Sequence, residues 1–99
     1  MTINKTLNES ELTIRLEGRL DTLTAPELEK ELKHSIAGVE ELTFDIAGLH
    51  YVSSAGLRVL LSAQKVMNRQ GNMTIRNVCP GIMEVFELTG FADILNIEE

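Results

Sequence analysis

The hydrophobic pattern of the chain changes period several times, and this alternation constrains the fold more than any other feature. Over residues 12–16, apolar side chains stand at every second position, a period of two that predicts a strand with one buried face. Residues 3–7 can pair with it across the turn formers at 8–10, which predicts a β-hairpin. Gly18 is expected to break the second strand.

A helix is predicted directly after the hairpin. Thr24 is followed three residues later by Glu27, a capping-box pattern that marks a helix start. Apolar residues recur every four positions over 28–36 and give this helix one buried face. Gly38 is placed to end the helix in a left-handed turn.

Strand and helix patterns then alternate to the end of the chain. The expected elements are a strand over 41–46, a helix over 55–70 ended by Gly71, a strand over 73–75, a helix from Pro80 ended by Gly90, and a strand over 94–97. The predicted order is therefore β-β-α-β-α-β-α-β. This order favours one α/β domain over residues 1–99, with a mixed sheet of four or five strands and right-handed crossovers between parallel neighbours.

The same periodicities predict which side chains form the core. We expect these positions to be buried: Leu12, Ile14, Leu16, Phe44, Ile46, Leu57, Leu60, Leu61, Ile75 and Phe86.

Composition narrows the class of function. With 99 residues, 43% of them hydrophobic, the chain has the size and balance of a single globular domain. The net charge of −6, with nine scattered Lys and Arg residues, argues against nucleic acid and anionic membranes and favours protein partners. The single cysteine, Cys79, excludes an internal disulfide and a Cys-rich metal site. No membrane span or signal peptide is recognisable, so we expect a cytoplasmic protein without membrane insertion, metal or cofactor.

Two small hydroxyls, Ser53 and Ser54, stand between an apolar run and the longest predicted helix. Neither glycine-rich phosphate-loop motif occurs, and the G-x-S-x-G motif of a serine nucleophile is also absent. A triad would need a histidine beside Ser54, and His50 is the nearer of two. The remaining alternatives are a helix cap, worth about 1 kcal/mol, and a hydroxyl that is modified at the positive end of a helix.

Two aspartates, Asp21 and Asp45, lie near predicted strand ends. Open α/β sheets place functional groups at the carboxyl ends of their strands, and Ser54 falls there as well. We expect Asp21 and Ser54 to share one edge of the molecule. The alternative for each aspartate is the formation of a turn.

Several segments together resemble the STAS domain of bacterial anti-sigma factor antagonists. The similarity runs from about residue 12 to residue 97 and is carried by the segments Gly18–Asp21, Phe44–Ile46 with Leu49, Tyr51–Leu57, Phe86 and Thr89–Phe91. The serine-glycine segment with the upstream G-x-L-D is the most specific part.

The resemblance implies a protein-binding switch rather than an enzyme. In that family, an anti-sigma factor kinase phosphorylates the serine that opens the second helix, and only the unphosphorylated form binds this kinase and frees its sigma factor. The usual motif, Asp-Ser-[Ser/Ala]-Gly-[Leu/Val], maps the acceptor to Ser54 and places Ser53 where the aspartate normally stands. Ser53 is therefore either the helix cap or a rival acceptor. The implied partner surface comprises Asp21, Ser53, Ser54, Ala55, Gly56 and Leu57.

Other members of the family suggest a second function. Similar small STAS domains are non-enzymatic subunits that stabilise the ATPase of a lipid-transport complex. A small serine hydrolase is a third and more distant hypothesis.

Overall fold

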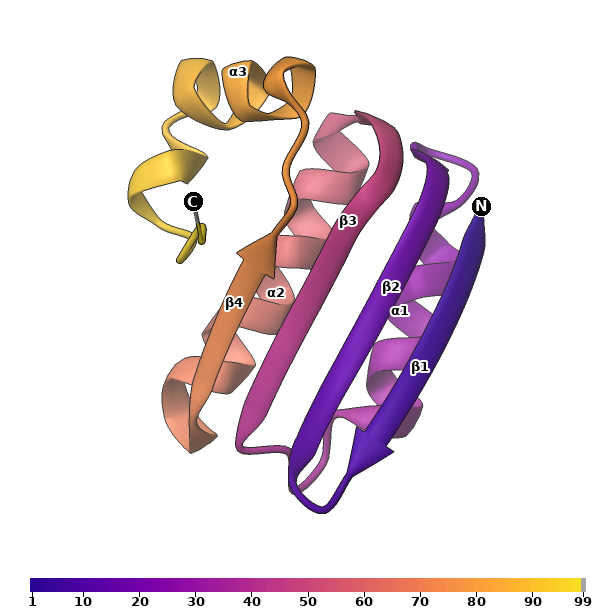
Figure 1. The fold of residues 1–99 in the computed structure, drawn as a ribbon, viewed down its shortest axis with the longest axis vertical. Coiled ribbons are helices and arrows are strands. Elements are labelled where there is room, and N and C mark those ends of the chain that lie inside the picture. The colour runs from indigo at the N-terminus through magenta and orange to yellow at the C-terminus, as the bar shows by residue number, and fades with distance from the viewer. Residues whose placement is uncertain (99) are drawn as a thin grey trace.

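The computed structural model describes residues 1–98 and contains a single mixed sheet (Figure 1). Strand order is β1-β2-β3-β4, with β1 antiparallel to β2 and the other neighbours parallel. This confirms the predicted α/β class and the hairpin. The elements are β1 (Thr2–Asn8), β2 (Glu11–Leu20), α1 (Ala25–Ser35), β3 (Glu41–Val52), α2 (Ser54–Gln70), β4 (Asn72–Arg76), α3 (Pro80–Thr89) and the short 3-10 helix η1 (Phe91–Asp93).

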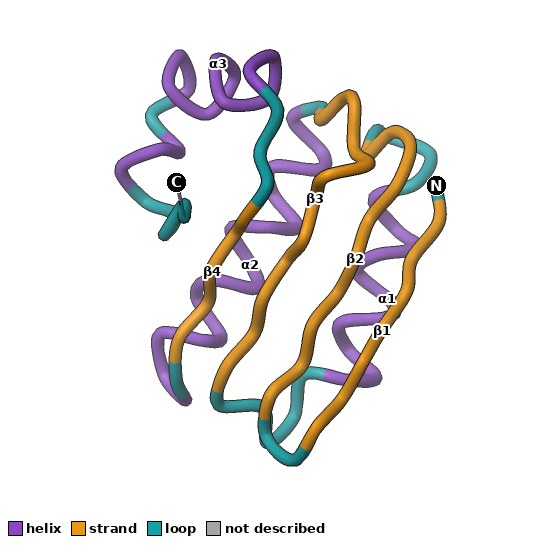
Figure 2. Tube along the Cα trace, in the orientation of Figure 1, coloured by secondary structure: helices purple, strands orange, loops and turns teal. Residues whose placement is uncertain are grey.

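Helices α1 and α2 cover the same face of the sheet, which is the rear face in Figure 1. Strands β2, β3 and β4 lie side by side in chain order, and α1 and α2 are the two crossovers between them. Because such crossovers are right-handed and both step in the same direction, both helices arrive on one face. Helix α3 lies beyond the carboxyl end of β4, away from the other two helices (Figure 2).

The core lies between the sheet and this helical layer. Nine of the ten predicted core side chains are buried, and Phe44, Ile14 and Leu60 are at most 1% exposed. Leu61 is the exception, because it lies one residue past Leu60 and is only partly buried. A step of one residue turns a side chain about 100° around a helix, which carries Leu61 away from the sheet.

The opposite face of the sheet is uncovered and polar. One row of paired residues crosses all four strands and consists entirely of threonine, from Thr6 through Thr13 and Thr43 to Thr74. Parallel strands are usually buried on both faces, and their sequences are then continuously apolar. Threonine keeps the β-branched shape that suits a strand while it presents a hydroxyl to water.

The strand boundaries correct two of the sequence predictions. Gly18 does not end β2, which continues to Leu20, and β3 runs to Val52 rather than stopping at residue 46. The pairing register shifts after Arg15 and again after Gly18, so that the 12 residues of β3 lie against the 10 residues of β2. Each bulge interrupts the period of two, and the sequence pattern of a regular strand is lost there.

The last predicted strand, over residues 94–97, is also wrong. Phe91–Asp93 forms a 3-10 helix, and the following segment makes one isolated parallel bridge between Ile97 and Ile75. The Ile75 N–H donates to the Asn96 carbonyl at 2.9 Å, and the Glu98 N–H donates to the Ile75 carbonyl at 2.8 Å. The N–H groups of Ile94 and Leu95 both donate to the Phe91 carbonyl, so these two residues stay in the turn after η1 and do not pair with β4.

Leu60→Ala tests the packing of α2 against the sheet. We expect it to leave a cavity and to lower the free energy of unfolding by about 2–5 kcal/mol, because Leu60 is buried between α2 and the sheet. The neighbouring Leu61→Ala is the matched control and should lower the free energy of unfolding clearly less. Equal denaturation midpoints for the two variants would contradict this packing.

Candidate functional site

The carboxyl ends of β2 and β3 meet the start of α2 at one edge of the molecule. Leu20 and Val52 are the last paired residues of the two strands, and the Ser53 N–H donates to the Leu20 carbonyl at 2.9 Å. Asp21 follows Leu20, and Ser54 follows Ser53. The junction therefore places Asp21 and the two serines side by side. This agrees with the expectation from the sequence that Asp21 and Ser54, which each follow a strand, share one edge of the molecule.

The close contact at this junction depends on Gly56. A Cβ atom at this position would lie 2.6 Å from Cγ of Leu20 and 3.0 Å from the Leu20 carbonyl oxygen. Real Cβ atoms do not approach other atoms so closely, so only glycine lets the first turn of α2 lie against the end of β2.

The two serines have different environments. Ser53 has extended backbone angles, φ −97° and ψ 176°, and its Oγ accepts a hydrogen bond from the Gly56 N–H at 3.4 Å. It is the N-cap of α2, as predicted. Ser54 is the first helical residue, its side chain is exposed, and its hydroxyl makes no hydrogen bond within residues 1–98. One hydroxyl therefore completes the helix, and the other is free to react or to contact a partner.

Asp21 organises the loop that leads into α1. Its Oδ1 accepts from the Leu23 N–H at 3.0 Å and from the Thr24 N–H at 3.1 Å. The hydrogen bond from the Thr24 backbone is the largest cause that lowers the pKa of Asp21. Partial desolvation acts in the opposite direction, but the net pKa is lowered. The capping box predicted at Thr24 is wrong, because Thr24 already has helical backbone angles and its hydroxyl donates to the Arg19 carbonyl at 2.7 Å. The turn-forming role expected of an isolated aspartate is present at Asp21.

Two exposed apolar or aromatic side chains adjoin this loop and were not predicted from the sequence. Leu23 is 85% exposed and Tyr51 is 41% exposed. The Arg19 guanidinium carbon lies 4.1 Å from the centroid of the Tyr51 ring, and its Nε lies 3.7 Å from Oδ2 of Asp21. Exposed apolar side chains beside a polar rim are typical of surfaces that bind other proteins. Leu23 could have been noticed as a leucine outside every periodic face.

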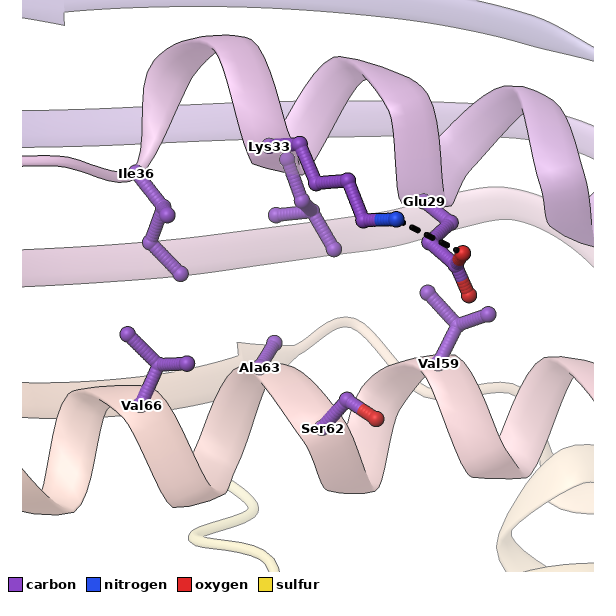
Figure 3. A pocket seen from close by; sticks show the side chains of 8 residues that line it. Glu29, Lys33, Ile36, Val59, Ser62, Ala63 and Val66 are labelled. Atoms are coloured by element: carbon purple, nitrogen blue, oxygen red, sulfur yellow. Dashed lines mark ion pairs between the residues drawn. The ribbon is translucent and has the colours of Figure 1, made fainter.

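A groove runs from this edge along the space between α1 and α2. Its first part, of about 340 Å³, includes Thr22, Ala55 and Arg58 in its lining. Its second part, of about 290 Å³, is lined mainly by apolar side chains of both helices (Figure 3). The two parts share Glu29, Val59 and Ser62. Figure 3 shows the ion pair between Glu29 and Lys33 along the α1 wall, at 3.3 Å.

Asp45 does not belong to this edge, although the sequence placed it near a strand end. It lies within β3 on the uncovered face, 8% exposed, with Oδ2 at 3.7 Å from the side-chain nitrogens of both Arg15 and Arg76. Its Oδ1 accepts from Nδ2 of Asn77 at 3.0 Å and from the Ala47 N–H, across the first bulge, at 3.2 Å. The hydrogen bond from Asn77 is the largest cause that lowers the pKa of Asp45. Asp45 thus stabilises the bulge that shapes the end of β3.

The described residues lack several other kinds of site. Within residues 1–98, no three His, Cys, Asp or Glu side chains are grouped so that they could hold a metal ion. Over the same residues, no helix has both the length and the apolar character needed to cross a membrane. His50 is exposed on β3, and no hydrogen bond joins it to Ser54.

Comparisons with known proteins agree on one family. The model of the STAS domain matches residues 2–99. The putative anti-sigma factor antagonist BtrV of Bordetella bronchiseptica is 37% identical over 84 residues, which are 83% of this chain and 72% of that protein. An anti-sigma factor antagonist from Mycobacterium paratuberculosis has the same fold, with a TM-score of 0.87 at 20% identity over 97% of this chain and 83% of its own. The phosphorylated form of the Bacillus cell fate determinant SpoIIAA gives a TM-score of 0.77 at 18% identity, over 99% and 92% of the two chains.

Gly56→Ala tests the contact between α2 and β2. The added Cβ has to displace Leu20, and we expect the free energy of unfolding to fall by about 1–3 kcal/mol. Gly81→Ala is the matched control, because nothing lies within 4 Å of its Cβ position in α3. It should raise stability by up to about 1 kcal/mol, the ordinary gain of alanine over glycine in a helix. Urea denaturation measures both, and a shift of the same sign in both variants would contradict the role of Gly56.

Asp45→Asn tests the charge at the bulge and predicts a dependence on pH. Asparagine can still accept both Oδ1 hydrogen bonds, although without the charge that strengthens them, and it removes the attraction to two partly exposed arginines at 3.7 Å. We therefore expect a loss of about 1 kcal/mol in the free energy of unfolding near neutral pH. Because the pKa of Asp45 is lowered in the folded protein, its contribution is complete above about pH 4 and disappears as the pH falls through the folded value. The difference in the free energy of unfolding between wild type and Asp45→Asn should therefore become smaller at acidic pH. The exposed Asp93→Asn is the control, and a difference independent of pH would overturn this account.

Proposed function

The chain belongs to the STAS domain family, and we propose that it is an anti-sigma factor antagonist, a protein that works by binding rather than by catalysis. In its unphosphorylated form it binds an anti-sigma factor that is also a serine kinase, and the sigma factor held by that kinase is released. Phosphorylation of Ser54 ends the binding. The antagonist named BtrV, at 37% identity, supports this assignment.

One observation carries the proposal: an exposed, unbonded serine hydroxyl at the first residue of α2, held beside Asp21 by the hydrogen bond between Ser53 and Leu20. A kinase needs its acceptor hydroxyl to be accessible, and a protein partner needs a surface of some width around it. The same edge supplies both. Exposed Leu23 and Tyr51 extend this surface beyond the serine.

The different environments of the two serines favour Ser54 as the acceptor. The Ser53 oxygen accepts from the Gly56 N–H, and its modification would disturb the cap of α2. A phosphate on Ser54 would instead lie at the positive end of the helix dipole, which favours an anion by about 0.3–1 kcal/mol.

The proposed partner surface divides into contacting and supporting residues. Asp21, Ser53, Ser54 and Ala55 are exposed or partly exposed and can contact a partner. Gly56 and Leu57 are buried, and Leu57 is only 6% exposed. We assign these two the role of holding the start of α2 low against β2, so that a partner approaches the serines closely.

Ser54→Asp and Ser54→Ala test the switch. At an interface shaped for a neutral hydroxyl, a carboxylate loses its solvation and is repelled by the like charges of the nucleotide that the kinase binds. A cost of only about 3 kcal/mol in binding free energy weakens the affinity about a hundredfold. We expect Ser54→Asp to lose binding to the cognate kinase, with little change in melting temperature. Ser54→Ala should bind constitutively. Titration calorimetry and thermal melts on the three proteins measure both effects.

Incubation with the kinase and ATP, followed by intact mass, completes the experiment. Wild type should gain one phosphate and Ser54→Ala none. A phosphate that persists on Ser54→Ala would move the acceptor to Ser53. Equal affinities for wild type and Ser54→Asp would refute the switch and favour the role of a constitutive subunit in a transport ATPase.

A further inference from the structure

Arg58 is an exposed cation one helical turn after Ser54. It is the fifth residue of α2, and residues four apart on a helix are neighbours, with Cβ atoms about 5–6 Å apart. Arg58 also lines the groove next to Ala55, the residue that follows Ser54. Its side chain therefore belongs to the same surface as the free hydroxyl.

The guanidinium of Arg58 has no ionic partner among residues 1–98, which sets it apart from the other cations near the site. Arg19 is already paired with Asp21 and stacked on Tyr51. The other paired cations are Lys5 with Glu31, Lys33 with Glu29, and Arg15 and Arg76 with Asp45.

The local field of α2 makes an unpaired cation at this position unusual. Cations are favoured near the carboxyl end of a helix, whereas Arg58 lies near the amino end, and the first turn of α2 contains no acidic residue. Two acids of the adjoining elements are engaged elsewhere: Glu29, which lines the same part of the groove as Arg58, lies 3.3 Å from Lys33, and Asp21 lies 3.7 Å from Arg19. The first two turns thus combine a free hydroxyl with a free guanidinium and no anion.

We propose that Arg58 is the intramolecular partner of a phosphate on Ser54 and binds it by charge-assisted hydrogen bonds across one turn of α2. The inference rests on the phosphorylation proposed above. A guanidinium presents a planar pair of N–H donors that matches two phosphate oxygens, which a lysine ammonium does not. The phosphorylated form then differs from the free form in two ways, because it carries a new anion and it no longer offers Arg58 to a partner.

The experiment installs phosphoserine at position 54 during translation, so that it does not depend on a cognate kinase. The second ionisation of the phosphate is followed by phosphorus NMR in the wild-type background and in Arg58→Gln. An ion pair favours the dianion, so we expect Arg58 to lower this pKa by about 0.1–0.4 of a pH unit, a shift that Arg58→Gln abolishes. Arg58→Lys should retain part of it.

The matched control is Arg69→Gln, which removes another cation of α2 that has no ion pair within residues 1–98 but lies near the far end of the helix. It should leave the titration unchanged. Arg58→Gln should also lower the melting temperature of the phosphorylated protein and have little effect on the unmodified protein. Identical titrations and melts for Arg58→Gln and Arg69→Gln would overturn the pairing. A kinase that fails to modify Ser54 would instead overturn the proposed function and leave this result standing.

Discussion

The direct contact between the start of α2 and the end of β2 is the constraint on which the rest of the site depends. Leu20 contributes to it twice, because its carbonyl accepts from Ser53 and its side chain packs where a Cβ of residue 56 would otherwise lie. This contact fixes the height of the first helical turn above the sheet edge. The positions of the free hydroxyl, the Asp21 loop and the groove between the helices all follow from it.

The periodic parts of this fold could be predicted from the sequence. Strand β2 follows a strict alternation where it is regular, and α2 shows its broad buried face as clusters of leucine, valine and alanine. These patterns work because each element buries one face against a single layer. They fail at Leu61, because the leucine pattern of α2 extends further around the helix than its buried face, which continues through Ala63 and Met67.

The parts of the fold that could not be predicted are those in which the side chain of one residue accepts hydrogen bonds from backbone N–H groups, in place of regular backbone pairing. Asp45 accepts a backbone hydrogen bond across a bulge, and the alternation of residues 42–46, which predicts a strand, gives no sign that this aspartate is buried on the uncovered face. Asp21 accepts from the Thr24 N–H, which the capping box would pair with the Glu27 side chain, and the Glu27 N–H donates to the Thr24 carbonyl instead of to its hydroxyl. Either aspartate reads as a turn former, and only the contacts between strands decide that one is at the site and the other inside the sheet.

The bridge between Ile75 and Ile97 has a consequence for how the molecule behaves towards copies of itself. Strand β4 is the outermost parallel strand, and the open edge of such a strand is a template to which another chain can add by backbone pairing. The returning segment occupies the N–H and the carbonyl of Ile75, in the interior of a strand of only five residues. An incoming strand would have to displace this segment before it could form a continuous ladder. The bridge therefore hinders edge-to-edge aggregation through β4. One residue pair is enough for this, because β4 has only five residues.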